Sequence, residues 1–324
     1  MHLPAVLTCL LSITAQAAEF LPGVERILFL GDSITYEGHY VDEFERFLFT
    51  QFPERRFEVI ACGLPSETVS GLSEVGHAEG KFPRPDLHER LERVLAEAKP
   101  QLVFASYGMN DGIALPFDEV RFARFKEGIL RLREKVTLAG AAIVHLTPPT
   151  FDPLPIRDRV GDAATANATR PYSGYDEVLT RYSAWLMEPR NHDWRAIDIH
   201  SAMAEELATR RRGNPEFTFA KDGVHPNREG HELMARTLLR ALAPEHVTAY
   251  EQLTTSPVAQ GEDWKSMSAL VQKRRKLLSD AWLTATGHTR PGMTKGVPLA
   301  EAKAQAADIE KEIRALVTKM DPAP

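Results

Sequence analysis

The sequence predicts an α/β fold in which a parallel sheet of about five strands carries helices on both faces. Short apolar runs alternate with amphipathic helical stretches from about residue 25 to residue 243. Strands and helices that alternate in this way are joined by right-handed crossovers, which make neighbouring strands parallel. The first run, at residues 27–30, is apolar throughout and ends at Gly31, as expected for a strand buried on both faces. In such sheets, ligands bind at the carboxyl ends of the strands.

The expected elements follow one another along the chain. Strands are predicted at residues 27–30, 57–61, 102–105, 142–146 and 196–199. Apolar residues at helical spacing predict helices near residues 41–48, 87–98, 122–136, 179–186 and 233–242. Asp86 is expected to cap the second of these helices, and Gly140 to end the third. A proline-rich stretch at 148–155 predicts a long loop before the fourth helix.

Residues 258–324 have a different pattern and are predicted to form a C-terminal helical extension. Two helices are expected, at 264–285 and 299–320, with a linker that contains Gly and Pro between them. The second helix carries an apolar stripe, which must be buried. We expect it to pack against its own chain, with a homo-oligomer contact as the alternative. The basic run at 273–276 is expected on the solvated face of a helix.

The N-terminus is predicted to be a signal peptide, residues 1–17. Residues 3–13 are mostly apolar but too few to span a bilayer, and Ala15-Gln16-Ala17 has the pattern of a signal-peptidase site. The usual positively charged segment is missing. We therefore expect a secreted or periplasmic protein without stable membrane insertion, in which residues 18–257 form the main domain.

Composition excludes some classes of partner. Lys and Arg number 39 against 45 Asp and Glu, and the net charge of −6 comes from intermixed signs. A surface that binds nucleic acid needs clustered Lys and Arg, so no nucleic-acid partner is expected.

Signal cleavage would leave Cys62 as a single cysteine, which cannot form an intramolecular disulfide. No zinc-ligand spacing is found among His192, His200, His231 and His246.

Ser33 is the candidate nucleophile. It lies in Gly-Asp-Ser-Ile-Thr at residues 31–35, immediately after the first predicted strand. A serine hydroxyl is a weak nucleophile unless a base takes its proton. The alternative is that Ser33 only caps the helix that follows. No G-x-S-x-G motif surrounds it, which disfavours the α/β-hydrolase fold.

His225 is the candidate base. Asp222 precedes it by three residues in a loop that contains Gly and Pro. This spacing lets the carboxylate turn back to the imidazole, fix its tautomer and stabilise the imidazolium form. The alternative is a surface histidine beside a turn.

Gly63 and Asn110 are the candidate donors of an oxyanion hole, together with Ser33. They follow the second and third predicted strands. A backbone N–H and a side-chain amide can both donate to a tetrahedral intermediate, but Gly and Asn are also common turn residues.

Loop residues near these donors are candidates for binding substrate. Ser66, Glu67 and Asp111 are predicted to line the cleft, because functional residues concentrate on long loops. His77 and Arg84 are candidate sugar contacts in the same connection. The alternative for the residues of this connection is a structural or solvent-facing role.

The order of these motifs resembles the GDSL or SGNH hydrolase family over roughly residues 25–243. The matching residues are Ser33, Gly63, Asn110 and His225, with Asp222 completing a triad. The resemblance implies a flavodoxin-like three-layer αβα sandwich of about five parallel strands. It also implies hydrolysis of ester bonds without a metal or cofactor. The C-terminal helices lie outside it.

The expected function is that of a secreted serine esterase that acts on short-chain acyl esters. An O-acetyl group on a small molecule or polysaccharide is favoured, because an exported enzyme meets carbohydrate, and this step rests on analogy. A lipase or lysophospholipase is the first alternative. A non-catalytic carbohydrate-binding protein on the same scaffold is the second.

Overall fold

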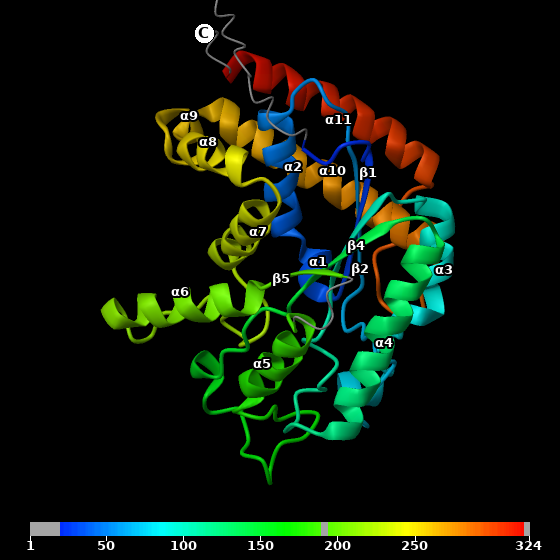
Figure 1. The fold of residues 1–324 in the computed structure, drawn as a ribbon, viewed down its shortest axis with the longest axis vertical. Coiled ribbons are helices and arrows are strands. Elements are labelled where there is room, and N and C mark those ends of the chain that lie inside the picture. Colours follow the sequence, from blue (N-terminus) through cyan, green and yellow to red (C-terminus); the bar gives the residue numbers. More distant parts are fainter. Residues whose placement is uncertain (1–19, 189–193, 321–324) are drawn as a thin grey trace, which may run out of the picture.

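The computed structural model describes residues 20–188 and 194–320, and its centre is a parallel sheet (Figure 1). The order β2-β1-β3-β4-β5 is that of flavodoxin-like folds. The strands are β1 (Arg26–Gly31), β2 (Glu58–Gly63), β3 (Leu102–Ser106), β4 (Ala142–Leu146) and β5 (Arg195–Ile197). Gly31 pairs with Gly63 and with Ser106, so the carboxyl ends of the three neighbouring strands lie level. The predicted fold class is confirmed.

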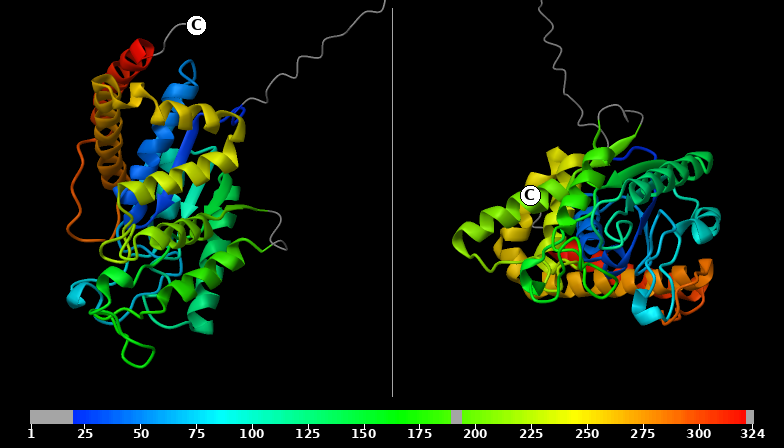
Figure 2. Two further views of the ribbon diagram at one scale, coloured as in Figure 1. Left: turned by 90° about the vertical axis from the view of Figure 1, so that its left-hand side faces the viewer. Right: turned by 90° about the horizontal axis from the view of Figure 1, so that it is seen from below.

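Helices flank both faces of the sheet (Figures 1 and 2). In chain order they are α1 (Ser33–Glu37), α2 (His39–Gln51), α3 (Leu87–Ala98), α4 (Glu119–Leu138), α5 (Tyr175–Leu186), α6 (Ile199–Gly213) and α7 (Arg228–Leu242), with short 3-10 turns η1 (His77–Gly80) and η2 (Leu154–Ile156). Asp86 caps α3 as predicted, since its side chain accepts from His88 N at 2.9 Å. Gly140 follows α4 with a φ of 81°.

The fifth strand is shorter than predicted. Ile197 and Ile199 alternate with polar residues, which favours a strand, but β5 ends at Ile197. The Asp198 side chain accepts from Ser201 N at 2.9 Å and thereby caps α6, a helix that the sequence analysis did not predict.

The C-terminal helices pack on the rest of the chain. They are α8 (Pro244–Thr255), α9 (Pro257–Gln260), α10 (Glu262–Thr286) and α11 (Leu299–Met320). α10 packs against β2 and α2, and α11 packs against α10. A second apolar cluster joins α2, α10 and α11 through Phe49, Met267, Val271, Ile309, Ile313 and Val317. The apolar stripe is therefore buried within its own chain, and an oligomer contact through these helices stays a prediction.

The prediction that the basic run at 273–276 lies on a solvated face was wrong for its two arginines, although Lys273 is exposed and Lys276 is half-buried. Arg274 and Arg275 are 5% and 4% exposed. Arg274 donates to Glu45 at 2.5 Å, and Arg275 donates to Asp42 at 2.5 Å. Both carboxylates lie on α2, and buried arginines are tolerated when they are paired in this way.

Two further predictions concern membranes and export. Within residues 20–188 and 194–320, no helix combines the length and the apolar character needed to cross a membrane. The predicted signal peptide, residues 1–17, lies outside the described residues.

Candidate active site

The structure brings Ser33, His225 and Asp222 together at the carboxyl end of β1. Ser33 is the first residue of α1, and His225 lies in the loop between α6 and α7. His225 Nε2 is 2.7 Å from Ser33 Oγ, and His225 Nδ1 is 2.6 Å from Asp222 Oδ2. An imidazole held in this way can take the serine proton while the carboxylate fixes its tautomer.

The loop that carries His225 is shaped by its own sequence. The backbone N–H groups of Val224 and His225 donate to Asp222 Oδ1 at 3.0 and 2.8 Å. Gly223 has a φ of 82°, and a Cβ at this position would lie 2.8 Å from Asp152 O. Glycine is therefore required at the turn that folds the carboxylate back onto the imidazole.

Electrostatics favour a charged Asp222 and a basic His225. Burial disfavours the Asp222 carboxylate, but hydrogen bonds from the His225 side chain and from backbone N–H groups hold its pKa well below the usual range. The hydrogen bond to Asp222 raises the pKa of His225, and the nearby charges of Asp32 and Glu37 add to this shift. Burial raises the pKa of Asp32 itself to about 6.

The raised pKa of His225 makes a testable prediction about pH. Only the neutral imidazole can act as a base, so kcat/KM should fall as pH drops through a pKa above the ordinary value of about 6.5. Asp222→Asn removes the main cause of the shift and should move this limb to lower pH. The measurement is kcat/KM from about pH 5 to pH 9 for both proteins. A wild-type limb at or below the ordinary value would contradict the prediction.

Asn110 lies beside this group of residues. Its Nδ2 donates to the Glu67 carbonyl at 3.1 Å and is 3.4 Å from Asp32 Oδ2, next to the nucleophile. Its neighbour Asp111 accepts from Val69 N and Ser70 N at 2.9 and 2.8 Å, which ties the loop after β3 to the loop after β2. The carboxyl ends of β1 and β3 therefore bring Ser33 and Asn110 to one place.

Glu67 and Asp111 are both fully buried, which differs from the expectation that they line the cleft. Arg90 donates to the two Glu67 oxygens at 2.6 and 2.7 Å, and Tyr107 Oη donates at 2.7 Å. With no exposed surface, neither carboxylate can contact a substrate. Both instead hold the loops that carry the site.

Gly63 and Ser66, the other two candidate site residues that follow or end β2, lie in different environments. Gly63 is buried, and a Cβ at this position would lie 2.3 Å from Tyr36 N, so its lack of a side chain lets α1 pack on β2. Its role as an oxyanion donor stays a prediction. Ser66 is half-buried with a φ of 69°, in the left-handed region that is uncommon for serine.

Arg84 contacts a residue of the active site, a role that the sequence analysis did not predict for it. It was a candidate sugar contact, but its Nη1 donates to Asn110 Oδ1 at 2.8 Å. The two residues are 26 positions apart, and no motif links them. Arg275 of α10 is a second example, because it donates to the Tyr36 and Glu37 carbonyls at the end of α1.

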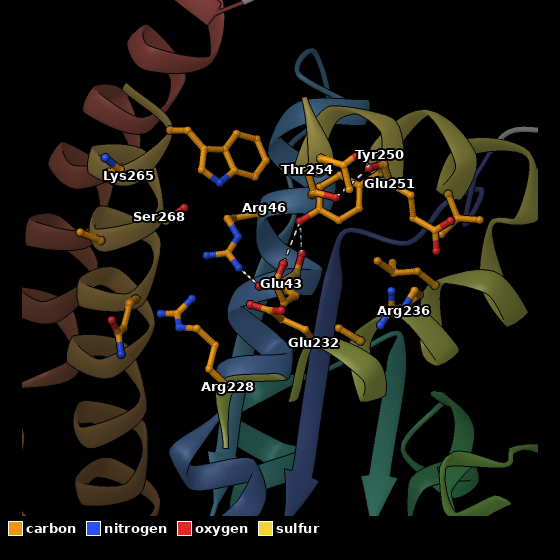
Figure 3. A pocket seen from close by; sticks show the side chains of 17 residues that line it. Glu43, Arg46, Arg228, Glu232, Arg236, Tyr250, Glu251, Thr254, Lys265 and Ser268 are labelled. Carbon is orange, nitrogen blue, oxygen red and sulfur yellow. Dashed lines mark hydrogen bonds and ion pairs between the residues drawn. The ribbon is translucent and has the colours of Figure 1, made fainter. Parts of the chain in front are cut away.

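A cavity of about 550 Å³ lies elsewhere, between α2, α7, α8 and α10 (Figure 3). Arg46 pairs with Glu43 in it, and Tyr250 Oη donates to Glu43 Oε2 at 3.0 Å. Ser33, Asn110 and His225 do not line it.

In the part of the chain that the structure describes, no group of three or more His, Cys, Asp or Glu is placed to hold a metal ion.

A serine, an imidazole and a carboxylate in one hydrogen-bonded chain, at the carboxyl end of a parallel sheet, define a serine-hydrolase type of site. The model of the GDSL-like lipase/acylhydrolase family matches residues 29–233. The chain belongs to this family and is an ester-bond hydrolase, which confirms the resemblance. No curated protein matches the chain.

Two solved structures illustrate the shared fold. A gut microbial diltiazem-metabolizing enzyme is 19% identical with a TM-score of 0.51, and the match covers 68% of this chain and 48% of that one. A catalytic mutant of Axe2, an acetylxylan esterase from Geobacillus stearothermophilus, is 21% identical with a TM-score of 0.50. That match covers 68% of this chain and 95% of the Axe2 chain.

Proposed function

We propose that the protein is an exported serine esterase that removes short-chain acyl groups, O-acetyl above all, from carbohydrate. The observation that carries the proposal is the chain of short contacts from Ser33 through His225 to Asp222. Export is supported by the apolar N-terminal segment and its Ala-x-Ala motif.

The first half of the reaction forms an acyl-enzyme. His225 Nε2 takes the Ser33 proton while Ser33 Oγ attacks the ester carbonyl carbon, and Asp222 stabilises the imidazolium. The resulting oxyanion accepts from the Asn110 amide and from the backbone N–H groups of Ser33 and Gly63. When the tetrahedral intermediate collapses, His225 gives the proton to the leaving alcohol.

The second half repeats these steps with water. His225 takes a proton from the water as its oxygen attacks the acyl carbon. Collapse breaks the bond to Ser33 Oγ, which regains the proton from His225 and releases the carboxylic acid. The cycle leaves the enzyme unchanged and uses one water for each ester bond.

Carbohydrate is favoured over lipid by the surroundings of the site. The side chains of His225 and Asp222 are 40% and 53% exposed, so the site opens directly to water. Among the described residues, the exposed large apolar side chains are Val75, Val120, Leu130, Leu138 and Met187. None of them lies on α1 or in the loop that carries His225, and Val75 is the one of the five that lies in the loop between β2 and α3. Axe2, which shares the fold, is named as an acetylxylan esterase.

The test is the initial rate of hydrolysis of p-nitrophenyl acetate, butyrate and octanoate. We expect kcat/KM to fall by about tenfold or more from acetate to octanoate, and acetate to be released from acetylated xylo-oligosaccharides. Preference for octanoate would assign the site to lipid esters. A folded protein that hydrolyses none of the three, yet binds xylo-oligosaccharides, would instead be a binding protein.

A further inference from the structure

We propose that Arg84 is a positioning residue that fixes the orientation of the Asn110 amide in the oxyanion hole. The inference rests on the proposed function, because it gives Arg84 a purpose only where Asn110 donates to an oxyanion. It also assigns a role to the long loop between β2 and α3.

The contacts around Asn110 define one orientation of its amide. Arg84 Nη1 donates to Oδ1 at 2.8 Å, while Nδ2 faces the Glu67 carbonyl at 3.1 Å and Asp32 Oδ2 at 3.4 Å. A flipped amide would place Oδ1 against two acceptors and would turn its NH₂ group toward a guanidinium, which has no acceptor. Arg84 therefore keeps the donor end of Asn110 on the side of the nucleophile.

Arg84 is itself held rigidly. Its Nε and Nη2 donate to Glu74 Oε2 and Oε1 at 2.7 and 2.8 Å, and its backbone N–H donates to Ser73 Oγ at 2.9 Å. His77 Nδ1 lies 3.0 Å from Glu74 Oε1, the oxygen that also accepts from Arg84 Nη2. Because the two-point pairing uses Nε and Nη2, Nη1 remains free to point at Asn110.

The charge of Arg84 is neutralised by this pairing. The side chains of Arg84 and Glu74 are only 11% and 8% exposed. Burial disfavours the Glu74 carboxylate, but the hydrogen bonds and charge of Arg84 lower its pKa, so Glu74 stays ionised at neutral pH. An arginine already engaged by a carboxylate and an amide is poorly suited to capture an anionic substrate. It is well suited to polarise the Asn110 carbonyl, which makes the amide N–H groups stronger donors.

The test is a double-mutant cycle with p-nitrophenyl acetate. Asn110→Ala should lower kcat by about 10²-fold or more, since one oxyanion donor is lost. Arg84→Met should lower kcat by about tenfold with little change in KM, because it weakens an interaction made in the transition state. In the Asn110→Ala background, Arg84→Met should have almost no further effect.

Controls separate positioning from other causes. Lys81→Met removes an exposed cation from the same loop and should leave kcat and KM unchanged. Additive losses in the cycle, or a raised KM with unchanged kcat, would overturn the proposal and make Arg84 a substrate contact. If Arg84→Met does not fold, Glu74→Gln loosens the same pair and must show the same lack of additivity with Asn110→Ala.

The cycle also distinguishes this inference from the proposed function. Ser33→Ala is run in parallel, and activity that survives it would defeat the esterase mechanism as a whole. Activity that depends on Ser33, together with additive effects of Arg84 and Asn110, would defeat the positioning role alone.

Discussion

Ser33→Ala is expected to lower kcat on p-nitrophenyl acetate by about 10⁴-fold or more, because it removes the nucleophilic hydroxyl. His225→Ala should cost a similar factor, since His225 Nε2 lies 2.7 Å from Ser33 Oγ and is the base that takes its proton. The double mutant should be no worse than either single mutant, because the two groups act as one unit. Steady-state rates of the three variants test this.

A matched control is available for the serine. Ser201 is exposed on α6, and its side chain does not hydrogen-bond to Ser33, Asn110 or His225, so Ser201→Ala should retain full activity. Wild-type rates in Ser33→Ala, with a normal unfolding transition, would show that a different group attacks the ester.

Arg275→Met is expected to lower the free energy of unfolding by about 3–5 kcal/mol, because it removes the arginine partner of the buried Asp42 carboxylate, which keeps only His39 Nδ1 at 3.2 Å. Arg275 is 4% exposed and donates to Asp42, which is 2% exposed, at 2.5 Å. It also donates to the Glu37 carbonyl at 2.7 Å, at the end of the helix that begins with Ser33. Urea unfolding followed by circular dichroism measures the effect, and kcat should fall as well because α1 loses a contact.

Lys273→Met supplies the comparison for this loss. Lys273 belongs to the same basic run on α10 but is exposed, so its replacement should change the free energy of unfolding by no more than about 0.5 kcal/mol. Equal effects of the two substitutions would mean that the buried pair does not hold α10 against α2.

Much of the fold was predictable from local patterns. A continuous apolar run predicts β1, and apolar residues at helical spacing predict α3. Both elements lie where they were predicted. The site was predictable for a related reason. Ser33 and Asn110 follow strands whose carboxyl ends lie level in a parallel sheet, so the topology alone brings them to one edge.

The unpredicted features depend on contacts between distant segments. The local sequence around Arg275 suggests a solvent-exposed residue. In the folded chain, Arg275 instead pairs with Asp42 of α2, which is 233 positions away. Glu67 lies on a long loop, which suggests contact with substrate, but Arg90 and Tyr107 enclose it. A charged side chain gives no local sign of whether its partner will be water or another buried group.

The most direct test of the central claim is covalent labelling with a fluorophosphonate, followed by peptide mass spectrometry. The activated serine hydroxyl attacks the phosphorus of the reagent as it would attack an ester carbonyl carbon, and fluoride leaves. We therefore expect one adduct per chain, on the peptide that contains Ser33. Labelling should proceed in step with loss of esterase activity and should be absent from Ser33→Ala and greatly slowed in His225→Ala. An adduct on another residue, or full activity with no adduct, would contradict the assignment of Ser33 as the nucleophile.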